Sequence, residues 1–159
     1  MENNFKFRHV DENDASLLHE LAKKSPPLDV HTVYTYWVIC NFFSKSCIIV
    51  EDNGIPFAYI IAIENDDTVF IWQICILEQY RGKRISALLI DFICKYAETK
   101  RKIVSVSIDK ENIASNSAFQ SYCSKNSYTL ERIGSLSLKD LSNPQFSENE
   151  EIYVFKKSL

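Results

Sequence analysis

The chain has 159 residues, of which 46% are hydrophobic and 25% are charged, and its formal net charge at pH 7 is −3. This length and composition exclude a disordered chain and are typical of one folded domain, which we expect to span residues 1–159. The slightly acidic balance offers no general attraction to nucleic acid or to an anionic membrane, so we expect neither as a partner.

Five cysteines occur, without the CxxC or Cys/His spacing that holds a metal, at positions 40, 47, 75, 94 and 123. Four lie in apolar segments such as WVICNFF and WQICIL, where reduced thiols of the core are expected. The sequence has neither a signal-peptide pattern nor the run of about 20 apolar residues that crosses a bilayer. We therefore expect a cytoplasmic protein without a metal site.

The pattern of apolar residues predicts two helices near the start of the chain. Within residues 12–24, four small or apolar side chains recur at helical spacing, namely Ala15, Leu18, Leu21 and Ala22. The prolines of SPPLD end this helix. An aromatic-rich second helix follows over residues 32–43, with Thr32 as its N-cap.

A β-rich region follows these helices. The segments CIIVED and PFAYIIAIE are separated by Asn53-Gly54, which predicts a hairpin. The nearly continuous apolar run TVFIWQICIL predicts a strand buried on both faces. A helix over residues 84–99, the strand KIVSVSID and the helix NIASNSAFQSYCSKN come next, and a loop-like segment from Ser135 to Asn149 precedes a final strand, IYVFKK. This order predicts an α/β fold with mixed strand directions.

The segment QYRGKR, residues 79–84, joins the long apolar strand to the next helix. Free N–H groups and the dipole at a helix N-terminus attract anions, and Gly82 would let a phosphate approach the backbone. The side chains of Arg81, Lys83 and Arg84 could add charge-assisted hydrogen bonds. From the glycine alone, an ordinary loop with solvated basic side chains is the more frequent structure.

This segment resembles the Q/R-x-x-G-x-G/A pyrophosphate loop of the GNAT superfamily of acetyl-CoA-dependent N-acetyltransferases. The resemblance implies a GNAT fold, with helices on both faces of a mixed central sheet, and acetyl-CoA as cosubstrate. Arg84 stands where that superfamily usually has Gly or Ala, and we expect it to adopt helical φ. The residues to which the resemblance gives coenzyme contacts are Ile74, Ile76, Gln79, Arg81, Gly82, Lys83, Arg84, Ile85, Asn112, Ser115 and Phe119.

The segment DKENIASNSAFQSY resembles the GNAT pattern N-x-x-A-x-x-x-Y, in which the Asn contacts the coenzyme and the Tyr protonates the leaving thiolate. Asn112 matches this Asn, and it is equally well interpreted as a helix N-cap. Phe119 occupies the Tyr position. Tyr122 lies one helical turn further on, and we interpret it as a half-buried helix residue in preference to a catalytic acid.

Three segments resemble the L-2,4-diaminobutyrate acetyltransferases more closely: SPPLDVHTVYTYWVIC, VFIWQICI and SIDKENIASNSAF. In that family phenylalanine is usual at the position of Phe119, whereas Asn and Pro are usual at the positions of His31 and Val33. The resemblance covers most of residues 5–122. It implies acetyl transfer from acetyl-CoA to the side-chain amine of diaminobutyrate, in ectoine synthesis. Acetylation of another small amine or amino acid, and a non-catalytic acyl-CoA-binding domain, are the alternatives.

Diaminobutyrate has two ammonium groups and one carboxylate, so its site requires anions for the amines and hydrogen-bond donors for the carboxylate. We expect Asp29 to bind an amine, although a loop aspartate is also a common helix cap. Tyr34 and Tyr36 lie two residues apart and do not share a helix face, so one of them can line the site while the other packs. The resemblance to the diaminobutyrate acetyltransferases implies Tyr34 for the substrate site. Trp72 is either a cation–π surface or a core residue. We expect Gln73 to point to the opposite face of the strand and to form structural hydrogen bonds.

The acceptor ammonium must lose a proton before it can attack the thioester. The carboxylates that we consider as bases are Asp29, Glu150 and Glu151, and Glu151 is also expected to bind substrate. His31 is a further, weaker candidate. By analogy with GNAT enzymes, the backbone N–H of Ile74 would stabilise the oxyanion. Cys75 is rejected as an acyl carrier, and the aromatic helix 32–43 favours a homodimer.

Overall fold

The computed structural model describes residues 5–137 and 149–158. Seven strands form one sheet in the order β1-β2-β3-β4-β5-β7-β6. They are β1 (Phe5–His9), β2 (Cys47–Asp52), β3 (Ile55–Glu64), β4 (Thr68–Ile76), β5 (Ile103–Asp109), β6 (Tyr128–Ser137) and β7 (Asn149–Lys157). Among these described strands, only β4 and β5 pair in parallel, and the other neighbours are antiparallel. The predicted mixed α/β sheet is confirmed.

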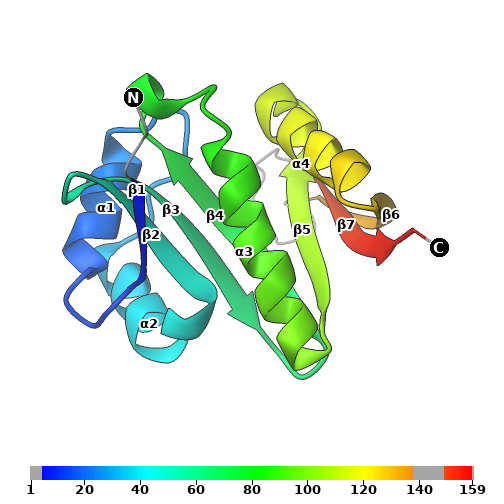
Figure 1. The fold of residues 1–159 in the computed structure, drawn as a ribbon, viewed down its shortest axis with the longest axis horizontal. Helices are drawn as coiled ribbons and strands as arrows, with labels where there is room; N and C mark the ends of the chain where they lie inside the picture. The colour runs from blue at the N-terminus through cyan, green and yellow to red at the C-terminus, as the bar shows by residue number, and fades with distance from the viewer. Residues whose placement is uncertain (1–4, 138–148, 159) are drawn as a thin grey trace.

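Helices cover both faces of this sheet (Figure 1). They are α1 (Ala15–Lys23), α2 (Val33–Phe42), α3 (Ile85–Lys100) and α4 (Ile113–Lys125). On one face, Leu18 of α1 and Ile39 of α2 share a buried cluster with Ile61 of β3. On the other face, Leu89 of α3 and Phe119 of α4 pack in a second cluster. Apolar burial on each face therefore fixes the three layers.

Local signals predicted most of these elements correctly. The Oγ1 atom of Thr32 accepts a hydrogen bond from the backbone N–H of Thr35 over 3.1 Å, which is the expected N-cap of α2. Asn53 and Gly54 both have positive φ and turn β2 into β3. Two strands were not predicted, β1 and β6. Both lie at the sheet edges and have no continuous buried pattern, so pairing with β2 and β7 defines them. Of the predicted loop 135–149, residues 135–137 belong to β6, Asn149 begins β7, and 138–148 lie outside the described residues.

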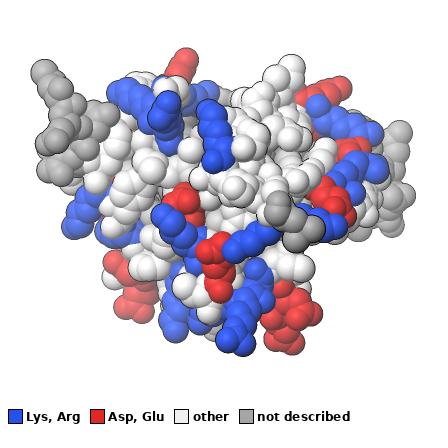
Figure 2. Space-filling view, turned by 45° about the vertical axis from the view of Figure 1, so that its right-hand side comes forward, with Lys and Arg blue, Asp and Glu red and all other residues white. Residues whose placement is uncertain are grey.

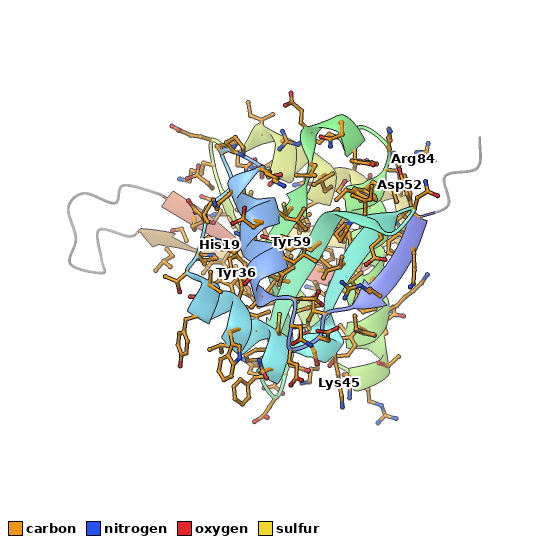
Figure 3. All side chains as sticks on the ribbon, turned by 90° about the vertical axis from the view of Figure 1, so that its left-hand side faces the viewer. His19, Tyr36, Lys45, Asp52, Tyr59 and Arg84 are labelled. Atoms are coloured by element: carbon orange, nitrogen blue, oxygen red, sulfur yellow. The ribbon has the colours of Figure 1, made fainter. Side chains whose placement is uncertain are left out.

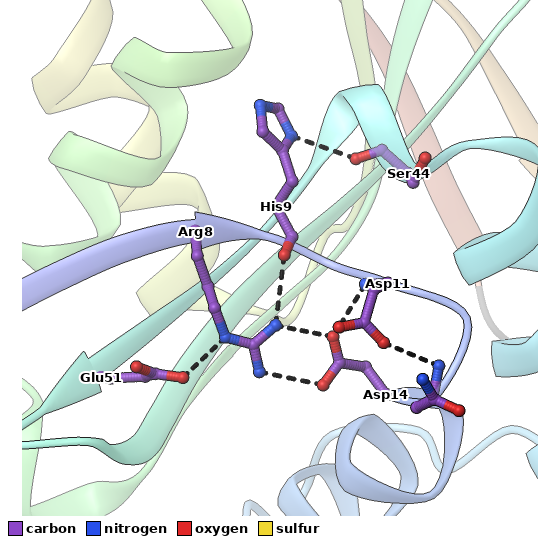
Figure 4. Close-up of polar contacts among 7 residues, drawn as sticks. Arg8, His9, Asp11, Asp14, Ser44 and Glu51 are labelled. Atoms are coloured by element: carbon purple, nitrogen blue, oxygen red, sulfur yellow. Dashed lines mark hydrogen bonds and ion pairs between the residues drawn. The ribbon is translucent and has the colours of Figure 1, made fainter.

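Besides the backbone pairing of β1 with β2, the side chain of Arg8 connects β1 to two other segments (Figure 4). Its guanidinium donates to Glu51 of β2 over 2.7 Å and to both carboxylate oxygens of Asp14 over 2.7 and 2.9 Å. The backbone N–H of Asp11 also donates to Asp14, over 2.8 Å. Burial alone would raise the pKa of Asp14, but the hydrogen bonds from Arg8 and Asp11 and the charge of Arg8 lower it overall. One arginine therefore links β1, β2 and the start of α1.

Strands β4 and β5 separate partway along their length. Their parallel pairing runs from Thr68↔Ile103 to Ile71↔Val106 and includes no later residue of β4. At the same point β4 carries a β-bulge, because Ile61 of β3 pairs with Gln73 and Ala62 pairs with Ile71, which leaves Trp72 as the extra residue. The edge of β4 that faces β5 is therefore open beyond the bulge.

The prediction that β4 is buried on both faces is wrong. Alternate residues of the strand are buried, whereas Ile74 and Ile76 are only half-buried and Trp72 is 38% exposed. Beyond the bulge β4 has β3 as its only described neighbour, so the edge that β5 has left and the side chains beside it stay accessible. The second half of β4 is therefore accessible although its sequence is apolar.

Charge on the molecular surface is mixed. The face shown in Figure 2 carries Lys and Arg interspersed with Asp and Glu, without a broad area of one sign. Among the described residues, no helix has the length and apolar character needed to cross a membrane.

Candidate active site

The loop between β4 and α3 has an unusual backbone. Gly82 has φ +77°, and a Cβ built there would have no heavy atom within 4 Å, so open space lies against the backbone. Arg84 has φ 62° and is left-handed, and α3 begins at Ile85. The expectation of helical φ at Arg84 is therefore wrong. A left-handed position explains why Gly, which adopts it without strain, is usual in the loops that this segment resembles.

The N-terminus of α3 lacks the side-chain cap that α2 and α4 have. The first N–H groups of the helix donate to no side chain at this cap, because the guanidinium of Arg84 has donors and no acceptor. The loop that leads into these donors carries further cations: Nζ of Lys83 lies 5.0 Å from the centroid of the Tyr80 ring, and Nε of Arg81 donates to the carbonyl of Ile76 over 3.1 Å. Free donors, the helix dipole and three cations together can bind a phosphate group.

Tyr80 anchors this loop to the end of the β2–β3 hairpin. Its ring stacks on Phe57 with centroids 3.8 Å apart, and its hydroxyl donates to Asp52 over 3.0 Å. The hydrogen bond to Asp52 raises the pKa of Tyr80. Asp52 and Arg84 lie at the same end of the sheet, opposite Lys45 (Figure 3). Sequence reasoning did not identify this role of Tyr80, since no periodicity connects it to Phe57.

The backbone of β4 presents hydrogen-bonding groups along its open edge. The N–H of Leu77 donates to the carbonyl of Phe57 over 3.0 Å, so Leu77 faces β3. Because antiparallel residues face their partner alternately, Ile74 and Ile76 direct their N–H and C=O groups away from β3. The carbonyl of Ile76 indeed accepts from Arg81 and from the hydroxyl of Ser25. The N–H of Ile74 is thus placed where β5 has separated.

Gln73 organises a buried polar cluster beside this edge. Its Oε1 accepts from the hydroxyls of Tyr36 (3.1 Å) and Tyr59 (2.5 Å), and its Nε2 donates to the backbone carbonyl of Asp29 over 2.7 Å. The expected structural role of Gln73 is confirmed. Burial raises the pKa of Tyr59, so its hydroxyl stays protonated. The loop that carries Asp29 is therefore attached to β4 by a side-chain amide.

Trp72 lies on the same side of the sheet as Gln73, and the prediction that the two point to opposite faces is wrong. The bulge interrupts the alternation of β4, so that Ile71 packs with α3 while Gln73 contacts Tyr36 of α2. The Trp72 ring lies 4.9 Å from that of His31, which is 6.0 Å from Tyr36. The structure thus brings His31, Trp72 and the Asp29 backbone together.

The two tyrosines of α2 differ in position, as their spacing predicts. Tyr34 is 72% exposed and stacks on Trp37 with centroids 5.9 Å apart. Tyr36 is fully buried, close to His19 and Tyr59 (Figure 3). Asp29 itself is exposed. Tyr36, which we expected only to pack, is the tyrosine that hydrogen-bonds to Gln73. The sequence signal that distinguishes the two is helical spacing, because Tyr36 shares a face with Ile39 and Cys40, which are also buried.

Glu151 is held in a different place, on β7 opposite Ile108 of β5. Its carboxylate forms ion pairs with Arg132 and with Lys110, the latter over 3.2 Å. The hydrogen bond from Arg132 lowers the pKa of Glu151, with a further contribution from Lys110. A carboxylate with two cationic partners is a weaker base than an ordinary one.

Helix α4 begins at the expected cap and then enters the core. Oδ1 of Asn112 accepts from the backbone N–H of Ser115 over 3.0 Å. Phe119 is buried against Phe155, with ring centroids 6.0 Å apart. Tyr122 is also buried and donates to Asp91 over 3.0 Å, and burial raises its pKa. The interpretation of Tyr122 as a structural residue is confirmed, and it is more deeply buried than expected.

The five cysteines are free and buried, which confirms the prediction for the four in apolar segments and adds Cys123. Burial raises the pKa of Cys75 to about 11, and its Sγ donates to the carbonyl of Leu21 over 3.5 Å. A protonated thiol in this position is a poor nucleophile. Within residues 5–137 and 149–158, no group of three His, Cys, Asp or Glu side chains could hold a metal ion.

Known acetyltransferase sequences are similar to this chain. The sequence model of the Acetyltransferase (GNAT) family matches residues 15–123. The L-2,4-diaminobutyric acid acetyltransferase of Streptomyces coelicolor is 29% identical over 125 residues, which are 75% of this chain and 74% of that protein. The protein of the same name from Bordetella parapertussis is 26% identical over 113 residues, 67% of this chain and 60% of that protein.

Two solved structures have a similar fold. Diaminobutyrate acetyltransferase EctA from Paenibacillus lautus, solved in complex with L-2,4-diaminobutyric acid and coenzyme A, superimposes with a TM-score of 0.86 at 21% identity, over 98% of this chain and 96% of that one. Ard1 from Thermoplasma volcanium gives a TM-score of 0.79 at 12% identity, over 96% of this chain and 97% of that one. Strands β4 and β5, the loop 79–84 and the two helical layers therefore belong to a GNAT fold.

Proposed function

This chain belongs to the acetyltransferase (GNAT) family, and we propose that it transfers the acetyl group of acetyl-CoA to the side-chain amine of L-2,4-diaminobutyrate, as a step of ectoine synthesis. One observation carries the proposal. The open edge of β4 leads from the cationic loop 79–84 to the cluster of Asp29, His31 and Trp72. A phosphate-bearing acyl donor and a cationic acceptor can thus meet on one strand. The names of the similar sequences support the choice of acceptor.

The loop and the open edge fit coenzyme A. The N–H groups at Ile85, the space at Gly82 and the side chains of Gln79, Arg81, Lys83 and Arg84 would hold the pyrophosphate. Ile74 and the N–H group of Ile76 would pair with the amide groups of the pantetheine arm as a neighbouring strand does, since the carbonyl of Ile76 already accepts from Arg81 and Ser25. Asn112, Ser115 and Phe119 lie on the α4 side, where they would shape the wall next to the coenzyme.

The acceptor would bind on the other side of the bulge. The carboxylate of Asp29 attracts an ammonium group, and the face of Trp72 adds a cation–π contact. Tyr34 remains a proposed contact at the exposed end of this region. Glu151, kept ionised by Arg132 and Lys110, would act on the substrate through its charge and not by accepting a proton.

The reaction would proceed by direct transfer. The deprotonated amine attacks the thioester carbonyl carbon, so that a C–N bond forms and the C–S bond breaks. The N–H of Ile74 would donate to the oxyanion that develops on the carbonyl oxygen. The protonated state of Cys75 argues against a covalent acyl-enzyme step.

Acetyl transfer followed by mass spectrometry tests this function. L-2,4-Diaminobutyrate would be offered together with ornithine, lysine, putrescine and glutamine, and the expected result is a strong preference for diaminobutyrate, with one acetyl group on the side-chain nitrogen. Preference for another amine would identify a different GNAT acetyltransferase. If no amine reacts, titration with coenzyme A distinguishes a binding domain from a chain that has lost the coenzyme.

We also propose that the enzyme is a cytoplasmic homodimer that associates through α2. Residues 30–44 contain no Asp, Glu, Lys or Arg, yet three aromatic side chains of this segment are exposed: Tyr34, Trp37 and Phe42. Near a two-fold axis a surface meets its own copy, so an uncharged aromatic face can pair without like-charge repulsion. The free thiols of the core support a reducing compartment.

A further inference from the structure

We propose that His31 is a catalytic base of this enzyme and takes the proton from the acceptor ammonium. The inference rests on the proposed function and names the residue that activates the amine. It starts from a relationship that the fold creates, since His31 and Trp72 are 41 positions apart in sequence and their rings lie 4.9 Å apart.

The position of His31 is held by neighbours on both sides. Its ring lies against Trp72 at the bulge of β4 and 6.0 Å from Tyr36 of α2, and the residue is half-buried. The preceding loop is attached to β4 by the hydrogen bond from Gln73 to the carbonyl of Asp29. The imidazole is therefore carried on a segment anchored beside the N–H of Ile74, and preorganised groups make the more effective catalysts.

The polar surroundings of His31 differ from those of the other two histidines. In the described part of the chain, no hydrogen bond or ion pair involves the imidazole of His31. By comparison, Nδ1 of His9 lies 3.2 Å from the carbonyl of Ser44, and Nδ1 of His19 lies 3.6 Å from Glu20. His31 is thus the histidine whose nitrogens can face a bound amine.

The titratable groups around His31 come from four elements. Asp29 lies two residues earlier on the same loop, Tyr36 faces the ring from α2, and Trp72 of β4 adds no charge. Behind Tyr36 lie Tyr59 of β3, which stays protonated, and His19 of α1, whose ring is 6.2 Å from that of Tyr36. Asp29 is the one carboxylate in this set, and it would hold the second ammonium group or stabilise the imidazolium.

The proton balance of the step is simple. The ammonium gives one proton to the neutral imidazole, and the free amine attacks the thioester carbonyl carbon. As the C–S bond breaks, the second proton on nitrogen passes to the coenzyme thiolate, and the imidazolium then releases its proton to water. Imidazole suits this exchange because it accepts and releases a proton near neutral pH. Glu151, with its lowered pKa and two cationic partners, is less suited.

The test compares His31→Asn with His19→Gln in pH profiles of kcat/KM for diaminobutyrate. Asparagine is the residue usual at this position in the proteins that this segment resembles, and an amide cannot accept the proton. We expect His31→Asn to lower kcat/KM by about tenfold or more near pH 7. The deficit should shrink as the pH approaches about 9 to 10, because the amine then loses its proton without help. His19→Gln, which also removes an imidazole near Tyr36, should follow the wild type.

A second measurement does not depend on turnover. The chain has three histidines, so nitrogen-15 spectra of histidine-labelled protein give three imidazoles, one of which is absent in His31→Asn. Diaminobutyrate is expected to shift the His31 resonances while those of His9 stay unchanged, and the midpoint of the His31 titration should match the acidic limb of the activity profile.

Each outcome decides a separate point. If the wild type acetylates diaminobutyrate and His31→Asn keeps both its rate and its acidic limb, the role of His31 is overturned and the proposed function stands. If the wild type transfers acetyl to none of the amines, the proposed function fails and the role of His31 fails with it. Equal losses in His31→Asn and His19→Gln would also overturn the proposal, because they would indicate a general effect on Tyr36.

Discussion

The side-chain amide of Gln73 donates a hydrogen bond to the backbone carbonyl of Asp29 over 2.7 Å, across 44 positions of sequence. This contact attaches an exposed loop to the strand that would carry the reacting groups. The other end of the same amide accepts from two fully buried tyrosine hydroxyls, those of Tyr36 and Tyr59. Gln73 thus connects the core to the proposed acceptor site through hydrogen bonds.

Replacing Gln73 with leucine should both destabilise the protein and weaken acceptor binding. The variant leaves Tyr36 and Tyr59 without their amide acceptor, so we expect a loss of about 2–4 kcal/mol in the free energy of unfolding. Release of the Asp29 loop should raise KM for diaminobutyrate more than KM for acetyl-CoA. Urea unfolding and two-substrate kinetics measure the two effects.

A triple variant separates these effects. Adding Tyr36→Phe and Tyr59→Phe to Gln73→Leu removes the unsatisfied hydroxyls, so part of the lost stability should return. The loop would still lack its attachment to β4, and KM for diaminobutyrate should stay high. Recovery of KM together with stability would show that the contact to Asp29 does not matter for binding.

We expect Arg84 to lower the stability of the fold through its left-handed backbone, and to add a cation to the loop 79–84 that would bind phosphate. A non-glycine residue in the left-handed region costs about 1–2 kcal/mol, part of which glycine returns through its freer unfolded state, so Arg84→Gly should gain up to about 1 kcal/mol. We also expect Arg84→Gly to bind coenzyme A more weakly, by calorimetry. Arg101, at the other end of α3 with φ 57°, is the matched control. Arg101→Gly should be stabilised similarly while its affinity for coenzyme A stays unchanged, and equal affinities in both variants would contradict a role for Arg84.

The Arg8–Asp14 pair should make stability depend on pH on the acid side. The folded pKa of Asp14 lies below its ordinary value, so the pair stabilises fully above about pH 4 to 5 and loses its effect as the pH falls through the folded pKa. Arg8→Met should lower the free energy of unfolding by about 1.5–3 kcal/mol near pH 7, a range reduced for partial exposure of Arg8. The difference from the wild type should shrink on acidification.

Urea denaturation at several pH values measures this dependence. Arg8→Lys serves as the control, because it keeps the charge and loses the two-pronged contact with Asp14, and it should fall between the wild type and Arg8→Met. If the difference in the free energy of unfolding between Arg8→Met and the wild type stays constant across the acid range, protonation of Asp14 does not weaken its pair with Arg8, and the prediction is contradicted.

The aromatic face of α2 predicts the effect of a charge on self-association. Trp37→Glu would place two like charges near the proposed two-fold axis, so we expect the dimer to become a monomer in light scattering coupled to gel filtration. Leu88→Glu, at another exposed apolar position on α3, should leave the mass unchanged. A wild-type chain that is monomeric, or a Trp37→Glu dimer, would contradict an interface on α2.

Much of this molecule was predictable from local sequence, because its signals act over a few residues. Thr32 and Asn112 cap their helices, Asn53-Gly54 turns a hairpin, and the glycine of the basic loop has the positive φ that a turn into α3 requires. These features depend on side-chain to backbone hydrogen bonds and on allowed dihedral angles, which neighbouring residues determine. The resemblance of the same segments to GNAT proteins is likewise a property of contiguous residues.

Tertiary structure alone decided how the site is assembled. The bulge at Trp72 turned two adjacent side chains to one face, the separation from β5 opened an apolar strand, and ion pairs with Arg132 and Lys110 lowered the pKa of Glu151. Each of these depends on a partner that is distant in sequence, through strand register or charge, and periodicity within one segment does not contain that information. The pairing of His31 with Trp72 has the same origin: a loop and a strand meet because Gln73 holds them together.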